Sequence, residues 1–242
     1  MDKSPERPCP EWLLDDEFGT RARLGLIIPS SGWTPEHEWP RMMPRGVAYH
    51  IARMPLGNVT MAELKQMGRH ALTAAQMLAT ARVDVIGYGC TSQTFIEGMD
   101  YDRALARNLQ QETGIEVVTM IEAVLEALNR LGARKLAMVT PYTSDIAQRE
   151  IDFMQSLGFQ VLTEQSLHIA DTIEIAKVPP HQIIALGLET MHKVPDADVL
   201  FLSCGNLRTL EAIPQLEAAL MKPVISSNQA LVESLLARVG IR

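Results

Sequence analysis

The sequence carries an internal repeat, in which two apolar segments of its first half return in its second half. RLGLIIPSS (residues 23–31) resembles KLAMVTPYT (135–143), and VDVIGYGCT (83–91) resembles ADVLFLSCG (197–205). The offset is 112 residues for the first pair, measured from Pro29 to Pro141, and 114 for the second, measured from Cys90 to Cys204. Two nearly equal offsets indicate a duplicated unit, so the chain is expected to fold as two similar halves.

The repeated segments belong to a longer alternation of short apolar runs with segments of helical period. This alternation is typical of βαβ units around parallel sheets. The apolar runs predict eight strands, at residues 24–29, 47–54, 83–88, 116–119, 135–140, 160–163, 199–203 and 223–226. We therefore predict an α/β fold of two pseudo-symmetric lobes, each a roughly four-stranded parallel sheet flanked by helices, with the active site in the cleft between them.

Apolar residues that recur about every 3.6 residues predict the helices. One begins at Thr60 and extends through Leu78, and another runs from Thr119 to Gly132. Further helices fit residues 100–112, 144–157, 180–193, 209–221 and 228–239. Pro214 interrupts the 209–221 segment, which places the start of that helix near Ile213.

The repeat also predicts how the chain divides. Residues 1–20 form an N-terminal arm, residues 21–132 the first α/β lobe and residues 133–226 the second. The C-terminal helix, residues 227–242, is expected to pack back on the first lobe.

Charge and hydropathy argue against several kinds of partner. The formal net charge is −7 and the arginines form no basic stripe, whereas nucleic-acid binding depends on clustered Lys and Arg. No apolar run approaches the roughly 20 residues of a membrane span, and the charged, proline-rich N-terminus has no signal-peptide pattern. We expect a cytoplasmic protein with neither nucleic acid nor membrane as a partner.

Motifs for metals and common cofactors are missing from the sequence. The three cysteines, Cys9, Cys90 and Cys204, include no C-x-x-C pair that would indicate a zinc site or a disulfide framework. Gly87-x-Gly89 begins like a dinucleotide loop but lacks its third glycine. Residues 36–38 (Glu-His-Glu) are interpreted as a surface loop rather than a metal site. We therefore expect no metal and no cofactor.

The two repeated cysteines lie where parallel sheets bind ligands, beyond the carboxyl ends of the strands. If the lobes face each other, Cys90 and Cys204 meet across one cleft. Backbone N–H donors at a helix start or turn favour the thiolate, so we expect the pKa of such a thiol to be lowered and the group to act as a base or nucleophile. The alternative for either cysteine alone is a small buried hydrophobic residue.

Polar residues accompany both thiols and suit a carboxylate. The hydroxyls that follow the strands, together with the turn backbones, could hold carboxylate oxygens as charge accumulates on them; for each Ser or Thr separately, helix capping is the alternative. The candidate substrate-binding residues are Pro29, Ser30, Ser31, Thr91, Ser92, Tyr142, Gly205 and Asn206.

At these residues the chain resembles the aspartate/glutamate racemase superfamily, and within it the branch of arylmalonate decarboxylase and maleate cis-trans isomerase. The most specific segments are Ile28-Pro29-Ser30-Ser31, Cys90-Thr91-Ser92 and Leu202-Ser203-Cys204-Gly205. The resemblance implies two α/β lobes and an active site between them without cofactor or metal. In the decarboxylase a glycine stands at the first thiol position, which here is Cys90, whereas the maleate isomerase carries both thiols. The maleate isomerase has an asparagine, however, at the position where this chain has Gly32.

Three functions remain open from the sequence. The first is a cofactor-independent isomerase or racemase of a small carboxylate, which uses Cys90 and Cys204 through an enediolate or carbanion. The second is a decarboxylase that uses Cys204 as proton donor. The third is a non-catalytic carboxylate-binding protein on the same scaffold. The sequence leaves open whether the protein forms a homo-oligomer.

Overall fold

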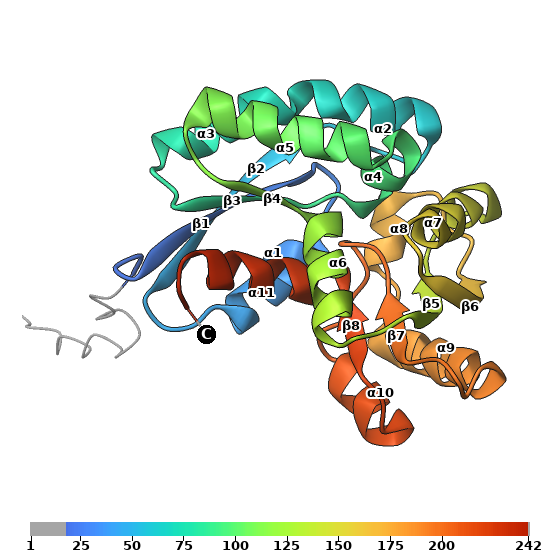
Figure 1. The fold of residues 1–242 in the computed structure, drawn as a ribbon. Coiled ribbons are helices and arrows are strands. Elements are labelled where there is room, and N and C mark those ends of the chain that lie inside the picture. Colours follow the sequence, from blue (N-terminus) through green and yellow to red (C-terminus); the bar gives the residue numbers. More distant parts are fainter. Residues whose placement is uncertain (1–17, 242) are drawn as a thin grey trace, which may run out of the picture.

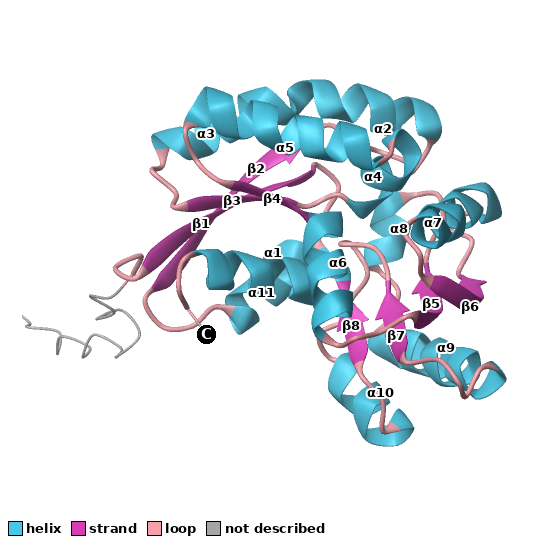
Figure 2. Ribbon diagram, viewed as in Figure 1, coloured by secondary structure: helices cyan, strands magenta, loops and turns pink. Residues whose placement is uncertain are grey.

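The computed structural model describes residues 18–241, and its strands form two separate parallel sheets (Figures 1 and 2). The first sheet has the order β2-β1-β3-β4 and the second the order β6-β5-β7-β8. The strands are β1 (Ala22–Pro29), β2 (Val47–Met54), β3 (Val85–Tyr88), β4 (Val117–Thr119), β5 (Lys135–Thr140), β6 (Gln160–Ser166), β7 (Val199–Leu202) and β8 (Val224–Ser226). The predicted α/β fold with two four-stranded parallel sheets is confirmed.

Helices cover both sheets and also stand between them. They are α1 (Thr34–Met42), α2 (Met61–Met67), the 3-10 helix η2 (Gly68–His70), α3 (Ala71–Thr80), α4 (Thr91–Glu97), α5 (Met99–Thr113), α6 (Met120–Arg130), α7 (Ser144–Ser156), α8 (Thr172–Ala176), α9 (Pro180–Lys193), α10 (Ile213–Leu220) and α11 (Ser227–Arg238). In Figure 1, α3 and α5 lie above the first sheet, α1 and α11 lie below it, and α9 and α10 lie on the outer side of the second sheet.

The two sheets repeat each other in strand order, and the register of β1 on β3 repeats in β5 on β7, whereas the pair β5–β6 has a register shift at Leu136/Ala137 that β1–β2 lacks. β1 is the first strand of the first half and lies between β2 and β3; β5 is the first strand of the second half and lies between β6 and β7. β3 and β7, which pair with them, end directly before Gly89-Cys90 and Ser203-Cys204. The strands read as apolar runs because both sheet faces are covered: every residue of β3 and β7 is buried. The carboxyl ends of β1, β3, β5 and β7 point toward the junction of the lobes (Figure 1).

The last helix connects the two sheets. α11 begins directly after β8 of the second sheet and packs on α6 and on β3 and β4 of the first. The contact with β3 is close at Gly87, where an added Cβ would lie 2.8 Å from Cδ1 of Leu235. A glycine is therefore needed there so that the helix can approach the strand. Most of the expected N-terminal arm, residues 1–20, lies outside the described residues.

Some helices differ from the sequence predictions. The segment from Thr60 is broken by the 3-10 turn Gly68–His70 rather than being one helix. The helix start near Ile213 is confirmed. The surface-loop interpretation of residues 36–38 is wrong, because they belong to α1 and Glu38 is 1% exposed. The short helices α4 and α8 were not predicted, since neither is long enough to show a clear period.

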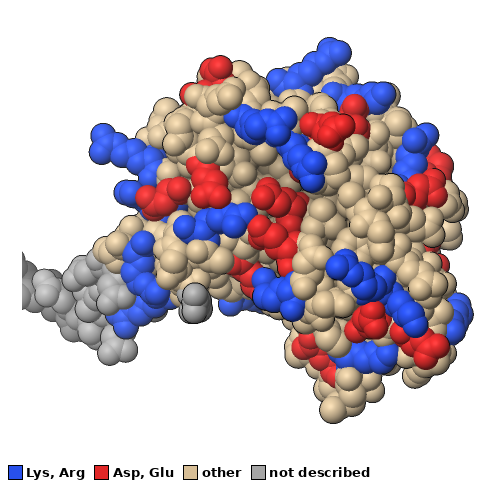
Figure 3. Space-filling view, in the orientation of Figure 1, with Lys and Arg blue, Asp and Glu red and all other residues tan. Residues whose placement is uncertain are grey.

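On the face seen in Figure 3, acidic and basic side chains are interspersed rather than sorted into separate patches. Within residues 18–241, no helix has the length and apolar content that crossing a membrane requires.

Candidate active site

The carboxyl ends of the strands border a cavity between the lobes. Cys90 and Cys204 both line it, one from each lobe. The other lining residues are Pro29, Ser31, Gly32, Pro35, Leu56, Val59, Gly89, Thr91, Ser92, Tyr142, Thr172, Gly205 and Asn206. This lining contains no Asp, Glu, Lys, Arg or His. An anionic substrate would therefore be held by hydroxyls and backbone N–H groups rather than by a cation.

Cys90 occupies the N-cap position of α4. Its backbone is extended, with φ −142° and ψ 104°, and its Sγ lies 3.6 Å from Oγ of Ser92. The backbone N–H groups of Ser92 and Gln93, which the first turn of a helix leaves without a helical partner, lower the pKa of the Cys90 thiol. These two donors and the Ser92 hydroxyl therefore favour the thiolate.

Cys204 lies in a tight turn directly after β7. Its φ of 102° is in a region that non-glycine residues rarely adopt. The Asn206 N–H donates to its sulfur at 3.4 Å, and the Tyr142 hydroxyl makes a second hydrogen bond to it. Strain of this kind is concentrated at functional sites, where the surrounding contacts hold it in place.

Burial decides the charge state of both thiols. It raises the pKa of Cys90 above its ordinary value despite the three donors, and it raises the pKa of Cys204 to about 11. The prediction of lowered thiol pKa values is therefore wrong: the expected donors are present, but loss of solvent outweighs them. At neutral pH both thiols carry their protons.

A serine at the start of α11 links the surroundings of the two thiols. Oγ of Ser227 accepts the backbone N–H of Cys204 at 3.1 Å, and the Thr91 hydroxyl lies 3.2 Å from the same oxygen. Thr91 also lies 3.0 Å from Sδ of Met120. Its hydroxyl thus has partners within the protein, although the residue borders the cavity.

The other sequence-predicted residues differ in how free they are to bind a ligand. Ser31 Oγ is buried and has no hydrogen-bond partner among the described residues, which leaves it available to a ligand. Ser30 lies outside the cavity lining and exchanges hydrogen bonds with the backbone of Leu56. Pro29, Ser92, Tyr142 and Gly205 border the cavity.

Asn206 also borders the cavity, but its side-chain amide is occupied by the protein. Its Oδ1 accepts the N–H groups of Trp33 and Thr34 at 2.9 and 3.0 Å, which caps α1. Its Nδ2 donates to the carbonyls of Ser31 and Thr172 at 3.3 and 2.6 Å. The side chain of Asn206 therefore fastens the Cys204 turn to the first lobe. Its backbone is bonded within the protein as well, because its N–H donates to Sγ of Cys204 and its carbonyl accepts the Thr34 hydroxyl at 2.7 Å.

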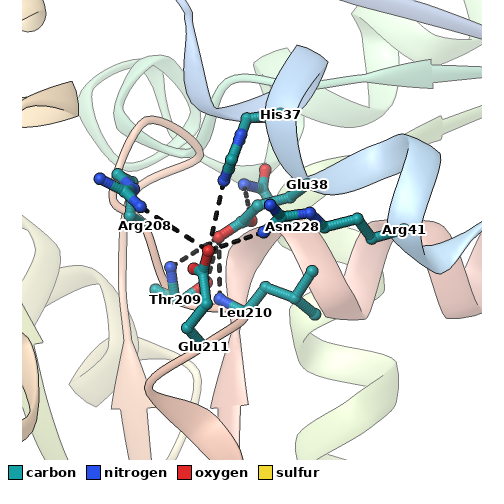
Figure 4. Close-up of polar contacts among 8 residues, drawn as sticks. All are labelled: His37, Glu38, Arg41, Arg208, Thr209, Leu210, Glu211 and Asn228. Atoms are coloured by element: carbon teal, nitrogen blue, oxygen red, sulfur yellow. Dashed lines mark hydrogen bonds and ion pairs between the residues drawn. The ribbon is translucent and has the colours of Figure 1, made fainter.

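A buried carboxylate that the sequence did not indicate reinforces this contact between the lobes (Figure 4). Oε1 of Glu38 accepts the N–H groups of Thr209 and Leu210 at 2.6 and 2.8 Å, and Oε2 accepts from Asn228 at 2.7 Å. Burial raises the pKa of Glu38 while these three donors lower it. We call Glu38, Thr209, Leu210 and Asn228 the inter-lobe clasp.

An outer ionic layer lies beside the inter-lobe clasp. Glu211 accepts from Arg41 at 2.7 Å and lies 3.2 Å from Nε2 of His37 and 3.7 Å from Arg208 (Figure 4). These side chains are about a third to a half exposed, so solvent screening leaves the pairs little stabilising effect. The inter-lobe clasp, which is buried, is the stronger determinant of how α1 sits on the loop after Cys204.

The described residues contain no group of three or more His, Cys, Asp or Glu side chains placed to hold a metal ion.

Two parallel-sheet lobes with one thiol from each in a shared cavity define a protein of the aspartate/glutamate racemase superfamily. The family model described as arylmalonate decarboxylase matches residues 24–242. The chain therefore belongs to the arylmalonate decarboxylase family.

The relatives of this chain are named for two different activities, maleate isomerisation and arylmalonate decarboxylation. The chain is 31% identical to a maleate isomerase of Pseudomonas putida over 234 residues, which cover 90% of this chain and 92% of the relative. It is 30% identical to an arylmalonate decarboxylase of Bordetella bronchiseptica, with 86% of each chain covered. A solved structure of a maleate isomerase from Pseudomonas putida S16, with maleate, superposes with a TM-score of 0.86 at 29% identity, covering 91% of this chain and 92% of that one.

Proposed function

We propose that this protein is an isomerase or racemase of a small carboxylate and that Cys90 and Cys204 carry out the reaction. The observation that carries the proposal is that both thiols line one cavity and reach it from different lobes. A pair of acid–base groups on opposite sides of a bound substrate suits the removal of a proton from one face and its return at the other.

The donors around the two sulfurs suggest how the roles divide. Three hydrogen bonds lower the pKa of Cys90 against the effect of burial, whereas two act on Cys204, whose pKa stays near 11. Cys90 is thus the thiol that ionises more readily, and Cys204 is the thiol that still carries its proton at neutral pH and can deliver it to the substrate. The unpartnered hydroxyl of Ser31 is the side chain proposed to hold the substrate carboxylate.

Both versions of the reaction balance with these groups. In racemisation, the Cys90 thiolate removes the α-proton, the electron pair moves into the carboxylate to give an enediolate, and the Cys204 thiol protonates the opposite face. In cis-trans isomerisation, the Cys90 sulfur adds to one alkene carbon and the electron pair again enters the carboxylate. The Cys204 thiol then protonates the resulting enediolate at carbon; rotation about the new single bond, return of that proton to Cys204 and expulsion of the Cys90 thiolate give the trans alkene.

The test is proton NMR in deuterated water with maleate, aspartate, glutamate, hydantoins and arylmalonates. We expect either loss of an α-proton signal or appearance of a trans alkene, and loss of that activity in both Cys90→Ser and Cys204→Ser. Cys9→Ser is the matched control and should retain full activity. Full turnover by either cavity variant would refute the two-thiol reaction.

Decarboxylation of a disubstituted malonate is a second candidate, favoured by the apolar residues of the cavity lining. Pro35, Leu56 and Val59 belong to that lining and suit an apolar substituent on the substrate. Loss of carbon dioxide would leave the enediolate, and the Cys204 thiol, protonated at neutral pH, would deliver its proton to carbon. Cys90 would then be dispensable, so Cys90→Gly would continue to release carbon dioxide.

The pH profile separates the two candidates. If Cys90 must ionise, kcat/KM rises with pH and is still rising at the ordinary thiol pKa of about 8.5, because burial raises the pKa of this thiol. If only the protonated Cys204 is needed, kcat/KM is flat through that range, since its pKa is about 11.

A further inference from the structure

A buried carboxyl group lies next to Cys204 but outside the cavity lining. Glu150, on α7 of the second lobe, is 0% exposed. Its Oε1 accepts the hydroxyl of Ser203 at 2.6 Å, and its Oε2 is buried without a hydrogen-bond partner among the described residues. Ser203 is the residue directly before Cys204, so this carboxyl group holds one side of the turn that carries the thiol.

The surroundings of Glu150 contain no compensating charge. The titratable groups coupled to it are Glu164 on β6, Tyr142 after β5 and Cys204 after β7, and no cation of residues 18–241 acts on its pKa. Burial, reinforced by Glu164, raises the pKa of Glu150 to about 8. At neutral pH the group is therefore an uncharged carboxylic acid.

The Cys204 turn needs such an anchor because its backbone is strained. Its φ of 102° must be held by contacts on both sides. On one side, Oγ of Ser227 accepts the Cys204 N–H at 3.1 Å. On the other, the Ser203 N–H donates to the Val139 carbonyl at 2.9 Å and the Ser203 hydroxyl donates to Glu150.

We propose that Glu150 is a positioning residue for Cys204: it holds Ser203 at the buried side of the strained turn and, while uncharged, leaves the thiol free to exchange its proton. When Glu150 loses its own proton, its negative charge opposes formation of the Cys204 thiolate. The role extends the proposed function, because it concerns the reacting thiol, but it is measurable on the thiol itself without a substrate.

The experiment measures how fast iodoacetamide alkylates Cys204 in the full chain, quantified by mass spectrometry of the peptide that contains it. Alkylation reports the thiolate fraction. The variants are Glu150→Gln, which keeps an acceptor for Ser203 but cannot ionise, and the matched control Asp152→Asn, which removes an exposed carboxylate from the same helix.

At pH 7, Glu150→Gln should react at the wild-type rate, because Glu150 is uncharged in both. At pH 9.5 it should react about threefold faster or more, which corresponds to about half a pKa unit. Asp152→Asn should follow the wild type at both pH values. Glu150→Ala, which removes the acceptor, should change the rate at pH 7 as well.

Equal rates for Glu150→Gln and wild type at pH 9.5 would overturn the proposal, as would the same acceleration in Asp152→Asn. These outcomes are independent of turnover. If no substrate is found but the pH-dependent acceleration is observed, the proposed function fails and the coupling between Glu150 and Cys204 stands. If turnover depends on both cysteines but the acceleration is absent, the positioning role fails alone.

Discussion

Replacing Glu150 with glutamine should stabilise the fold in a pH-dependent way. The pKa of Glu150 is raised from 4.5 to about 8 by complete burial, so the native state keeps a proton that the unfolded state loses above pH 4.5. The native protein therefore loses stability as the pH rises from about 4.5 to about 8. Each pKa unit corresponds to about 1.4 kcal/mol, so the loss between pH 5 and pH 7.5 is on the order of 3 kcal/mol.

Urea unfolding of the wild type and of Glu150→Gln at several pH values from 5 to 9 measures this effect. Glutamine has nearly the same volume, still accepts the Ser203 hydroxyl and does not titrate. Every other titrating group is common to both proteins, so the difference between their unfolding free energies isolates Glu150. We expect that difference to move in favour of glutamine by about 3 kcal/mol between pH 5 and pH 7.5 and to level off above about pH 9, once Glu150 is ionised in the native state as well.

Parallel stability curves from pH 5 to pH 8 would refute this reasoning, because they would mean that Glu150 is ionised in the native protein. Asp152→Asn controls for a general effect of removing one negative charge from α7. That side chain is exposed, so Asp152→Asn removes no buried group and should not reproduce the pH-dependent gain expected of Glu150→Gln.

Substitutions at three further residues test the contacts that shape the cavity. Glu38→Ala leaves the backbone N–H groups of Thr209 and Leu210 without their acceptor, removes one of the two acceptors of the Asn228 amide and should cost about 3 kcal/mol in urea unfolding. Glu38→Gln, which keeps one acceptor, should cost less. Asn206→Ala removes the cap of α1 and should destabilise the protein by about 2 kcal/mol, measured as a lower thermal midpoint. Tyr142→Phe removes a hydrogen bond that lowers the pKa of Cys204, so alkylation of Cys204 at pH 9 should slow while the unfolding midpoint in urea stays near that of the wild type.

The sheets could be predicted from the sequence because parallel strands covered on both faces appear as short apolar runs. β3 and β7 are buried at every position, and their repetition 114 residues apart pointed to the two lobes. Helix α1 could not be predicted in this way. It contains Pro35 and Pro40, and its first N–H groups are capped by Asn206, which is more than 170 residues away in the chain.

The same limit applies to the buried carboxyl groups. Glu38 and Glu150 lie on helices where a charged residue normally faces solvent, and their partners Thr209 and Ser203 are distant in the chain. No local pattern indicates such a contact. The prediction of a lowered thiol pKa was wrong for a related reason. The N–H donors beside Cys90 are a local feature that the sequence can indicate, whereas the burial that outweighs them depends on the whole fold.

The repeat gives the two thiols equivalent places at the ends of β3 and β7, but the residues behind them make the two places chemically different. Behind Cys90, burial raises the pKa of Asp102, while the hydroxyls of Thr94 and Thr119, which donate to it, lower that pKa. Behind Cys204, Glu150 has one hydroxyl donor and a pKa of about 8. A helix start provides N–H donors to Cys90, whereas a strained turn holds Cys204. Duplication alone would give two equal groups, and a reaction that distinguishes a nucleophile or base from an acid needs this difference between the lobes.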